Sequence, residues 1–554
     1  MHESGHHERE RFFGATKVIA GLTVLSRVLG MVRDMTIVAL GATRRTDAFW
    51  TAFKLGPNVF RRLFGEGALA AAFVPVFTEV GETDGPDRAR QVLANTAALL
   101  ALVLAVILAV IEACLAAAFL WLPLGWDHAL LVQFAMLLMP FMFTVCLLAL
   151  GSAALQCRGR FAYPAFAPIL LNIFMIAAAW TVHGLDLGDE NVGLTVLCLA
   201  VTAAGVTQLV GVVWLLRSVG LASWPRLRPV AEQTKRIARL MLPMMIPLSV
   251  VQFSSFFDGL YVWIMSATSE APTITIFGWT LVKPLTPGVV TRLYAAERLY
   301  NFPLGILAIS LATAVFPLFS RYAARGDISG LRGATNRSLR LSLFMGVPAG
   351  VALMLLAGPA LALIYRHRRF TADDADRAAW ILQMYSVGMW AYFANHILLR
   401  AFFSQKDIRT PLRLALWRAG INILLVTTLV FTPLRAGAIG LATAITSSVH
   451  ALVLVWVLHR RWGRIGLGEI LASLARTAFA TACMGGAVLG VLLLWPGGFS
   501  PGRHWTETGR LTALCVFCGA AAFLAAARAV RCPELAELWG AVHKPPQDDG
   551  HPTR

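Results

Sequence analysis

About fourteen long apolar runs dominate this sequence and constrain its fold more than any motif does. Each has the roughly 20 residues that an α-helix needs to cross the hydrocarbon core of a bilayer. Charged residues make up only 14% of the 554-residue chain, against roughly 25% in an average soluble protein. The sequence therefore predicts an all-α polytopic membrane protein with about 14 transmembrane helices. The runs lie near residues 15–42, 50–80, 91–122, 128–154, 162–184, 191–216, 237–266, 292–320, 338–365, 376–403, 411–432, 437–458, 469–494 and 508–530.

The net charge of +18 is concentrated in alternate loops between these runs. In a soluble protein such a charge indicates nucleic-acid binding, but here its placement indicates membrane topology. Cytoplasmic loops carry an excess of Lys and Arg, so the basic loops and both termini are predicted to be cytoplasmic, with no nucleic-acid partner. Two predicted outer loops also carry arginine, GATRRTD from Gly41 and YRHRRFTADDADR from Tyr365, each with carboxylates close by.

Two short patterns recur in the same order in both halves of the chain. Pro317 follows Pro75 by 242 residues within similar apolar clusters, and Pro411 follows Pro164 by 247 residues after similar basic turns. Such repeats are typical of secondary transporters, and no nucleotide-binding loop accompanies them. We therefore expect two pseudo-symmetric six-helix lobes followed by two more helices. The predicted parts are a cytoplasmic tail (1–14), an N-lobe (15–216), a basic linker (217–236), a C-lobe (237–458), two C-terminal helices (459–530) and a second cytoplasmic tail (531–554).

Several charged residues fall inside the predicted spans, where each charge costs roughly 2.5–3.5 kcal/mol at the bilayer centre. Arginines outnumber carboxylates in this group, and a guanidinium forms bidentate hydrogen bonds with phosphate. The excess indicates a cavity for an anionic ligand. The alternative is that the arginines reach the headgroups or form ion pairs between helices. The group consists of Arg27, Arg33, Asp34, Arg61, Arg62, Glu66, Glu297 and Arg298.

Asp258 lies alone in an apolar stretch and is a candidate ion-coupling residue. A carboxylate there binds sodium or carries a proton, and Asn422 and Thr443 would complete an oxygen-rich site. The alternative is a protonated acid that is hydrogen-bonded to a neighbouring helix. No metal cluster and no pair of catalytic carboxylates is found in the sequence.

Four stretches together resemble the MurJ (MviN) lipid II flippases of the multidrug/oligosaccharidyl-lipid/polysaccharide exporter superfamily. They are SRVLGMVRD, TDAFWTAFKLGPNVFRRLFGEGALAAAFVPVF, ERLYNFPLGILAISLATAVFP and FFSQKDIRTP. The resemblance covers about residues 15–530. It implies a transporter, not an enzyme, in the bacterial cytoplasmic (inner) membrane. Its activity would be to carry an undecaprenyl-diphosphate-linked peptidoglycan precursor outward by alternating access.

The resemblance also implies roles for individual residues. Substrate-binding residues would be Arg27, Arg33, Arg61 and Arg298, and gating or charge-tuning residues would be Asp34, Asp47, Glu66 and Glu297. Residues 459–530 would form a lipid-facing groove. The expected partners are lipid II or a similar lipid-linked diphosphate, membrane lipids and cell-wall synthesis proteins, for a monomer without cofactor. Transport would be driven by a coupling ion, sodium or a proton, or by the membrane potential.

Three features depart from the family pattern. Gly56 is inserted before Pro57, and Asn301 replaces an acidic residue. The stretch that follows Met265 is unusually long and predicts an external flap or a re-entrant segment. Another polyprenyl-diphosphate-linked oligosaccharide is the alternative substrate. A drug or cation antiporter is less favoured, because a cationic cavity has the wrong sign for cations.

The spacing within the first run raises a geometric question about its two arginines. Arg33 follows Arg27 by six residues, which places their side chains about 120° apart on an ideal helix. Either the helix bends at Gly30, or the two arginines act at different stages of transport.

Overall fold

The structure of the protein, a computed structural model, describes residues 21–55, 59, 68–185, 189–223, 232–276, 278–463, 465–495 and 505–543. Within these residues, ten helices are long and apolar enough to cross a membrane. The prediction of an all-α polytopic membrane protein is confirmed, while the number 14 stays a prediction.

The described chain divides into two compact units. Unit 1 comprises Met1–Thr291 with Arg368–Phe370, and unit 2 comprises Arg292–His367 with Thr371–Arg554. Residues 232–265 belong to unit 1 by their contacts, although the repeat pattern assigns them to the C-lobe. The lobe boundaries drawn from the repeats stay a prediction.

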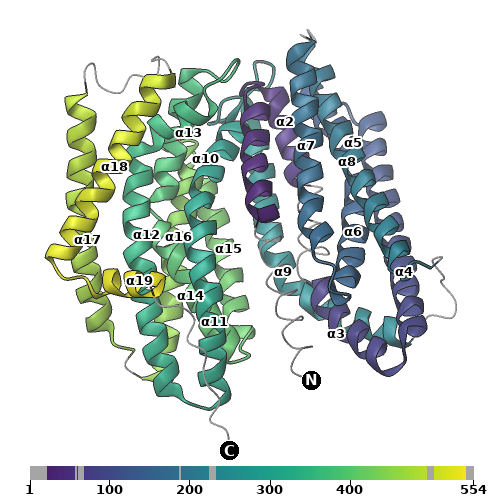
Figure 1. Ribbon diagram of the computed structural model, residues 1–554. Helices are drawn as coiled ribbons and strands as arrows, with labels where there is room; N and C mark the ends of the chain where they lie inside the picture. The colour runs from purple at the N-terminus through teal and green to yellow at the C-terminus, as the bar shows by residue number, and fades with distance from the viewer. Residues whose placement is uncertain are drawn as a thin grey trace, which may run out of the picture. The chain divides into compact units, whose positions relative to one another are not determined.

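Unit 1 is a bundle of helices (Figure 1), and its described residues include one β-hairpin. It begins with a continuous helix over residues 21–38. The elements that follow are α2 (Arg44–Phe53), α3 (Ala68–Thr83), α4 (Pro86–Trp121), α5 (Trp126–Leu138), α6 (Pro140–Cys157), α7 (Ala162–Gly184), α8 (Glu190–Ser218), α9 (Glu232–Met265), β1 (Thr273–Ile276), β2 (Trp279–Val282) and the first turn of α10 (Val289–Pro303).

Unit 2 contains the rest of α10 and all later helices. Its elements are η3, a π-helical segment (Leu304–Ala308), α11 (Ile309–Ala324), α12 (Ile328–Tyr365), α13 (Ala372–Ser386), α14 (Met389–Ser404), α15 (Arg409–Leu429), α16 (Gly437–Trp462), α17 (Leu467–Leu494), α18 (Trp505–Ala529) and α19 (Pro533–His543). Figure 1 shows α17 and α18 side by side, with α19 lying across the lower part of α12.

A glycine at the junction of α13 and α14 allows a close helix contact. A Cβ atom at Gly388 would lie 2.7 Å from the Cα of Ala444 and 2.7 Å from the Tyr392 hydroxyl oxygen. The backbone of α16 therefore approaches this point more closely than any side chain allows. Further along α14 from this junction, α14 and α16 pack in a core that includes the fully buried Phe402 and Leu454.

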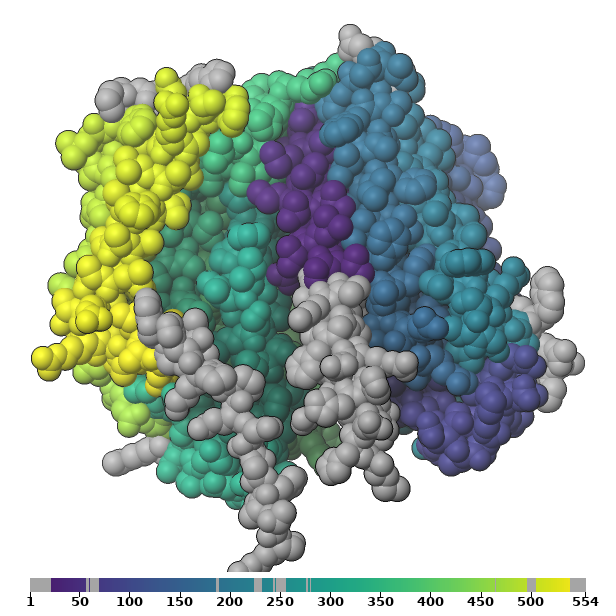
Figure 2. Space-filling model, in the orientation of Figure 1, coloured from purple at the N-terminus to yellow at the C-terminus, as the bar shows by residue number. Residues whose placement is uncertain are grey.

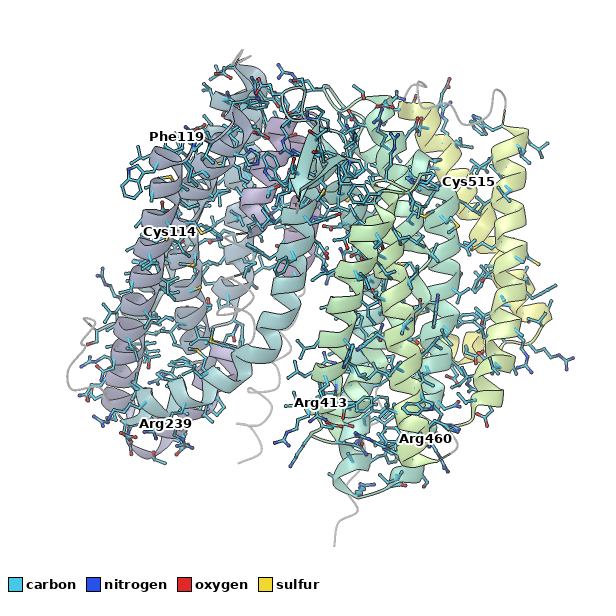
Figure 3. The ribbon with its side chains drawn as sticks, turned by 180° about the vertical axis from the view of Figure 1, so that it is seen from behind. Cys114, Phe119, Arg239, Arg413, Arg460 and Cys515 are labelled. Atoms are coloured by element: carbon cyan, nitrogen blue, oxygen red, sulfur yellow. The ribbon has the colours of Figure 1, made fainter. Side chains whose placement is uncertain are left out.

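The outward faces of several helices are apolar. On α4, Val103, Val106 and Val110 are 42%, 55% and 57% exposed and recur at the three- and four-residue spacing of one helix face. Figure 3 shows Phe119 near the opposite end of unit 1 from Arg239. Such an exposed apolar face is suited to lipid and would be costly in water.

The long stretch after Met265 forms a β-hairpin. Strands β1 and β2 pair antiparallel, with Thr273 opposite Val282. Gly278 in the turn has a φ of +84°, a conformation that favours glycine. The flap predicted from the length of this stretch is thus a two-stranded ribbon.

The helix α19 was not anticipated from the sequence, where residues 531–554 read as a tail. Glu534 is fully buried and accepts a hydrogen bond of 2.9 Å from the Ser473 hydroxyl on α17. Arg340 on α12 lies 3.5 Å from the same carboxylate, and Arg337 pairs with Glu537 at 2.9 Å. The ion pairs hold α19 against α12.

A carboxylate organises the turn between α14 and α15, outside the spans. Burial raises the pKa of Asp407, but hydrogen bonds from Thr410 and from Arg461 outweigh burial and lower this pKa to about 2. The Thr410 amide donates to Asp407 at 3.0 Å, and Arg461 on α16 donates to the same carboxylate. Arg413 and Arg460 lie at this same end of unit 2 (Figure 3).

We predict that Asp407→Asn lowers the free energy of unfolding by about 1 kcal/mol at pH 7, after allowance for solvent screening. A carboxyl whose folded pKa is depressed stabilises the fold above its unfolded pKa of about 3.9 and loses this contribution as the pH falls through its folded pKa. The melting-temperature difference between wild type and variant in detergent should therefore fall to about half between pH 7 and pH 3. Asp373→Asn, at an exposed ion pair on α13, is the control; a pH-independent difference for Asp407→Asn would contradict the assignment.

Candidate functional site

Arg33 and Asp34 form a buried ion pair on the first helix. The Arg33 Nε and Nη2 atoms donate to Asp34 Oδ1 at 3.0 and 2.7 Å, and the two residues are only 7% and 3% exposed. Arg33 Nη1 donates to Asn172 Oδ1 on α7 at 3.0 Å. Each charge of the pair is thus satisfied by protein groups inside the apolar stretch, which offsets the cost of burying them.

Asn172 holds the first helix at two points. Its Nδ2 atom donates to the Ser26 carbonyl at 3.0 Å, while its Oδ1 atom accepts from Arg33. The amide lies over Gly30, where an added Cβ would be 3.7 Å from Nδ2. Sequence reasoning missed Asn172, although an amide amid the apolar residues of a predicted span was itself a signal of a polar partner.

Arg27 lies on a different face of the same helix. Its side chain is exposed, and among the described residues no carboxylate pairs with it. Neighbouring Val24, Leu25 and Val28 are exposed as well. Figure 2 shows this helix, in purple, on the surface of unit 1 beside α7. The helix runs unbroken through Gly30, with Arg27 exposed and Arg33 buried.

The other predicted substrate residues are distributed differently. Arg61, Glu66 and the inserted Gly56 lie outside the described residues. Arg298 is exposed on α10 in unit 2; its Nε atom donates to the Tyr294 hydroxyl at 3.1 Å, and its guanidinium lies 5.2 Å from that ring.

Glu297 is half-buried, and its carbonyl accepts a hydrogen bond of 2.7 Å from the Asn301 side chain. Because Arg27 and Arg33 belong to unit 1 and Arg298 to unit 2, a cavity shared by all of them stays a prediction.

Asp47 caps the start of α10. It is fully buried and accepts hydrogen bonds from the Gly288 amide at 2.8 Å and from the Thr291 amide and hydroxyl at 2.9 and 3.0 Å. A carboxylate at a helix N-terminus also interacts favourably with the helix dipole. Gly288 has a φ of +85°, and a Cβ there would lie 2.1 Å from the Ala42 carbonyl oxygen. Asp47, for which the family resemblance implies a gating or charge-tuning role, thus links α2 to the N-terminus of α10.

The loop GATRRTD contains an arginine that is structural. Arg44 is buried and donates to Asp127 Oδ2 on α5 through Nε and Nη2 at 3.0 and 2.8 Å. It also donates to the Trp263 carbonyl at 2.8 Å and stacks 3.3 Å from the centre of the Trp263 ring. Because Arg44 is paired and stacked inside the fold, its charge does not indicate on which side of the membrane the loop lies.

The loop after Tyr365 has a comparable pair within unit 2. Arg292 Nε lies 3.0 Å from Asp374 Oδ1, and both side chains are buried. Asp374 also accepts from the Thr371 amide and hydroxyl and thereby caps α13. Asp373 and Asp374 of this stretch thus have partners within unit 2.

The candidate ion-coupling residues are divided between the units. Asp258 is half-buried on α9 in unit 1, and Asn422 and Thr443 lie on α15 and α16 in unit 2. Asn422 Oδ1 accepts from Thr446 at 3.4 Å, whereas Thr443 donates to the Ile439 carbonyl at 2.9 Å. A single site that contains Asp258 stays a prediction.

Comparison with protein families gives one match over most of the chain. The family described as "Lipid II flippase MurJ" matches residues 37–507. A probable lipid II flippase MurJ from Rhizobium meliloti is 30% identical over 488 residues, which cover 85% of each chain. The Vibrio cholerae protein of the same description is 29% identical and covers 85% of this chain and 87% of its own.

Solved structures share the fold. A lipid II flippase MurJ in an inward closed conformation has a TM-score of 0.70 at 18% identity and covers 95% of this chain and 99% of its own. An inward-facing multidrug resistance transporter of the MATE family has a TM-score of 0.63 at 15% identity, over 81% of this chain and 98% of its own. At these identities the likeness concerns the fold alone.

We predict that Asn172→Ala destabilises unit 1 by about 2–3 kcal/mol, because it leaves a buried guanidinium N–H of Arg33 without its acceptor and removes the second hydrogen bond to the Ser26 carbonyl. The measurement is thermal unfolding in detergent, followed by fluorescence-detected size exclusion. Thr181→Ala on the same helix is the control, since that hydroxyl is exposed and donates to the Ala177 carbonyl of its own helix; its effect should stay within about 0.5 kcal/mol. Equal melting of the two variants would contradict a clamping role for Asn172.

Proposed function

The chain belongs to the MurJ family of lipid II flippases, and we propose that it moves lipid II from the inner to the outer leaflet of the bacterial cytoplasmic membrane. Lipid II is the undecaprenyl-diphosphate-linked peptidoglycan precursor. The ten described helices that are able to span a bilayer suit a multi-pass transporter. We further propose that both termini are cytoplasmic, because the basic loops alternate with less basic ones.

The exposure of Arg27 is the observation that carries the proposed substrate site. A guanidinium beside exposed apolar residues is costly in a membrane unless a ligand or headgroup neutralises it. Arg27 contributes no ion pair to the described fold, so its charge is available to a ligand. A diphosphate supplies the oxygens that a guanidinium binds in a bidentate manner.

Arg33 would act later than Arg27 in this scheme. Its charge is balanced by Asp34 and its position is held by Asn172, so it gains a phosphate ligand only when this network rearranges. The two arginines would then contact the diphosphate at different stages, together with Arg61 and Arg298. Asp34, Asp47, Glu66 and Glu297 would tune the local charge.

Alternating access is the proposed mechanism of translocation. Each of the two compact units has many internal contacts of its own, which suits rigid-body rocking of one unit against the other around a bound headgroup. The prenyl chain would stay in lipid along residues 459–530.

The driving force is proposed to be the membrane potential or an ion gradient, with Asp258, Asn422 and Thr443 as coupling residues. We expect Asp258→Asn to abolish the response of transport in proteoliposomes to an imposed sodium or proton gradient while lipid II binding stays within about twofold of wild type. An unchanged response to both gradients would remove Asp258 from the mechanism.

The decisive variant for the substrate site is Arg27→Ala. Because Arg27 is exposed and unpaired within the described fold, the variant should keep its melting temperature yet lose lipid II affinity by about 10- to 100-fold, the equivalent of one charged hydrogen-bonded contact. It should fail to support growth of a strain depleted of its own flippase. Arg27→Lys should retain partial function, since it keeps the charge without the planar fork.

Arg90→Ala is the matched control, because the Arg90 side chain is 45% exposed and, among the described residues, forms an ion pair with Asp87 on its own helix alone. Normal growth of Arg27→Ala at wild-type protein levels would refute the site. Equal binding of lipid II and of a different undecaprenyl-diphosphate-linked saccharide would instead favour the broader substrate class.

A further inference from the structure

Unit 1 contains a cavity where residues 39–45, 182–185, 189–194 and 368–370 meet. Its volume is about 280 Å³. This is near the lower end of the range for small-molecule pockets, so it suits a headgroup better than a whole lipid. The lining residues are Leu40, Val182, His183, Glu190, Gly193, Leu194, Arg368 and Arg369.

The segment with the two arginines is fixed in place by its backbone. The Arg369 amide donates to the Ala39 carbonyl at 3.2 Å, and Phe370 is 1% exposed. Gly41, at a φ of +107°, lies so close that an added Cβ would be 3.1 Å from the Arg369 Cβ. Arg368 has a φ of +53°, a conformation that is strained for arginine and is retained only where the surroundings enforce it.

The rim of the cavity has an excess of positive charge. Arg368 and Arg369 are exposed, and among the described residues no carboxylate pairs with either. The one carboxylate of the lining, Glu190, accepts a hydrogen bond from Thr43 and lies 3.6 Å from Arg45. Glu190 is therefore already balanced by Arg45, and the charges of Arg368 and Arg369 remain for an anion.

A histidine lines the same cavity. His183 Nε2 lies 3.2 Å from the Thr36 carbonyl, which only accepts hydrogen bonds, so Nε2 carries the proton. This contact fixes the ring at the cavity wall. The Nδ1 atom is then the ring position left for a ligand or water.

One side of the cavity is apolar and continues into an apolar surface. Leu40 and Leu194 are 6% and 1% exposed within the lining. Next to it, Trp180, Leu185 and Val192 are 63%, 67% and 46% exposed. Tryptophan is enriched where a protein meets the interfacial region of a bilayer, so this surface suits the acyl or prenyl part of a lipid.

We propose that this cavity binds the phosphate of a lipid headgroup, with Arg368 and Arg369 as its ligands and the adjoining apolar surface in contact with the lipid chain. The site is distinct from the transport residues on the first helix. It would hold either a membrane phospholipid or a lipid-linked diphosphate, which share this chemistry. The proposal does not depend on which lipid is transported.

The test measures ligand binding to the purified full-length protein in a neutral detergent. The probes are dihexanoylphosphatidylglycerol, farnesyl diphosphate, inorganic phosphate and uncharged octyl glucoside. The variant Arg368→Gln/Arg369→Gln should raise the Kd of both lipid phosphates at least tenfold. Its matched control is Arg377→Gln/Arg435→Gln, which removes two exposed arginines that do not line the cavity, one of them also at a left-handed φ of +44°.

The source of the phosphate follows from the two lipid probes. Tighter binding of dihexanoylphosphatidylglycerol would assign the cavity to a phospholipid, and tighter binding of farnesyl diphosphate to a prenyl diphosphate. Three results would overturn the proposal. They are binding by the cavity variant within twofold of wild type, an equal loss in the control variant, and inorganic phosphate or octyl glucoside binding as tightly as the lipid phosphates.

Discussion

The neutralisation of charge inside an apolar bundle is the constraint on which the rest of this structure depends. A guanidinium or carboxylate that is removed from water needs a partner of opposite charge and hydrogen bonds for its remaining atoms. Arg33 has Asp34 and Asn172, and Arg44 has Asp127 and the Trp263 carbonyl. These pairs join the first helix to α7, and α2 to α5 and α9. The charges thus position the helices around them.

The same constraint separates structural arginines from those available to ligands. Arg33 and Arg44 are buried and paired within the described fold, whereas Arg27, Arg368 and Arg369 are exposed and have no described carboxylate partner. An unpaired cation at the edge of a membrane protein is neutralised by something outside the chain. For Arg27 we propose the transported diphosphate, and for the pair at the cavity rim a lipid phosphate. Both proposals place ligand binding where pairing within the described fold is incomplete.

The sequence identified the charged residues of the first helix, but it did not tell which of them are paired within the fold. Arg27 and Arg33 share one motif and their spacing places them on different helix faces, but the spacing does not tell that Arg27 is exposed and Arg33 buried. The difference depends on Asn172, which lies 139 residues beyond Arg33. The sequence likewise gave no sign of the partners of Asp47, because Gly288 and Thr291 lie more than 240 residues away.

The sequence by itself determined the membrane-spanning class, the approximate helix positions and the family, because apolar length and local motifs do not depend on distant contacts. It also marked the arginines that a bilayer does not tolerate without a partner. Only the tertiary structure decided which of them are paired, how the stretch after Met265 folds into a hairpin and where α19 docks. The physical reason is that each of these outcomes depends on groups from distant helices, and a charge is satisfied by what lies near it in space.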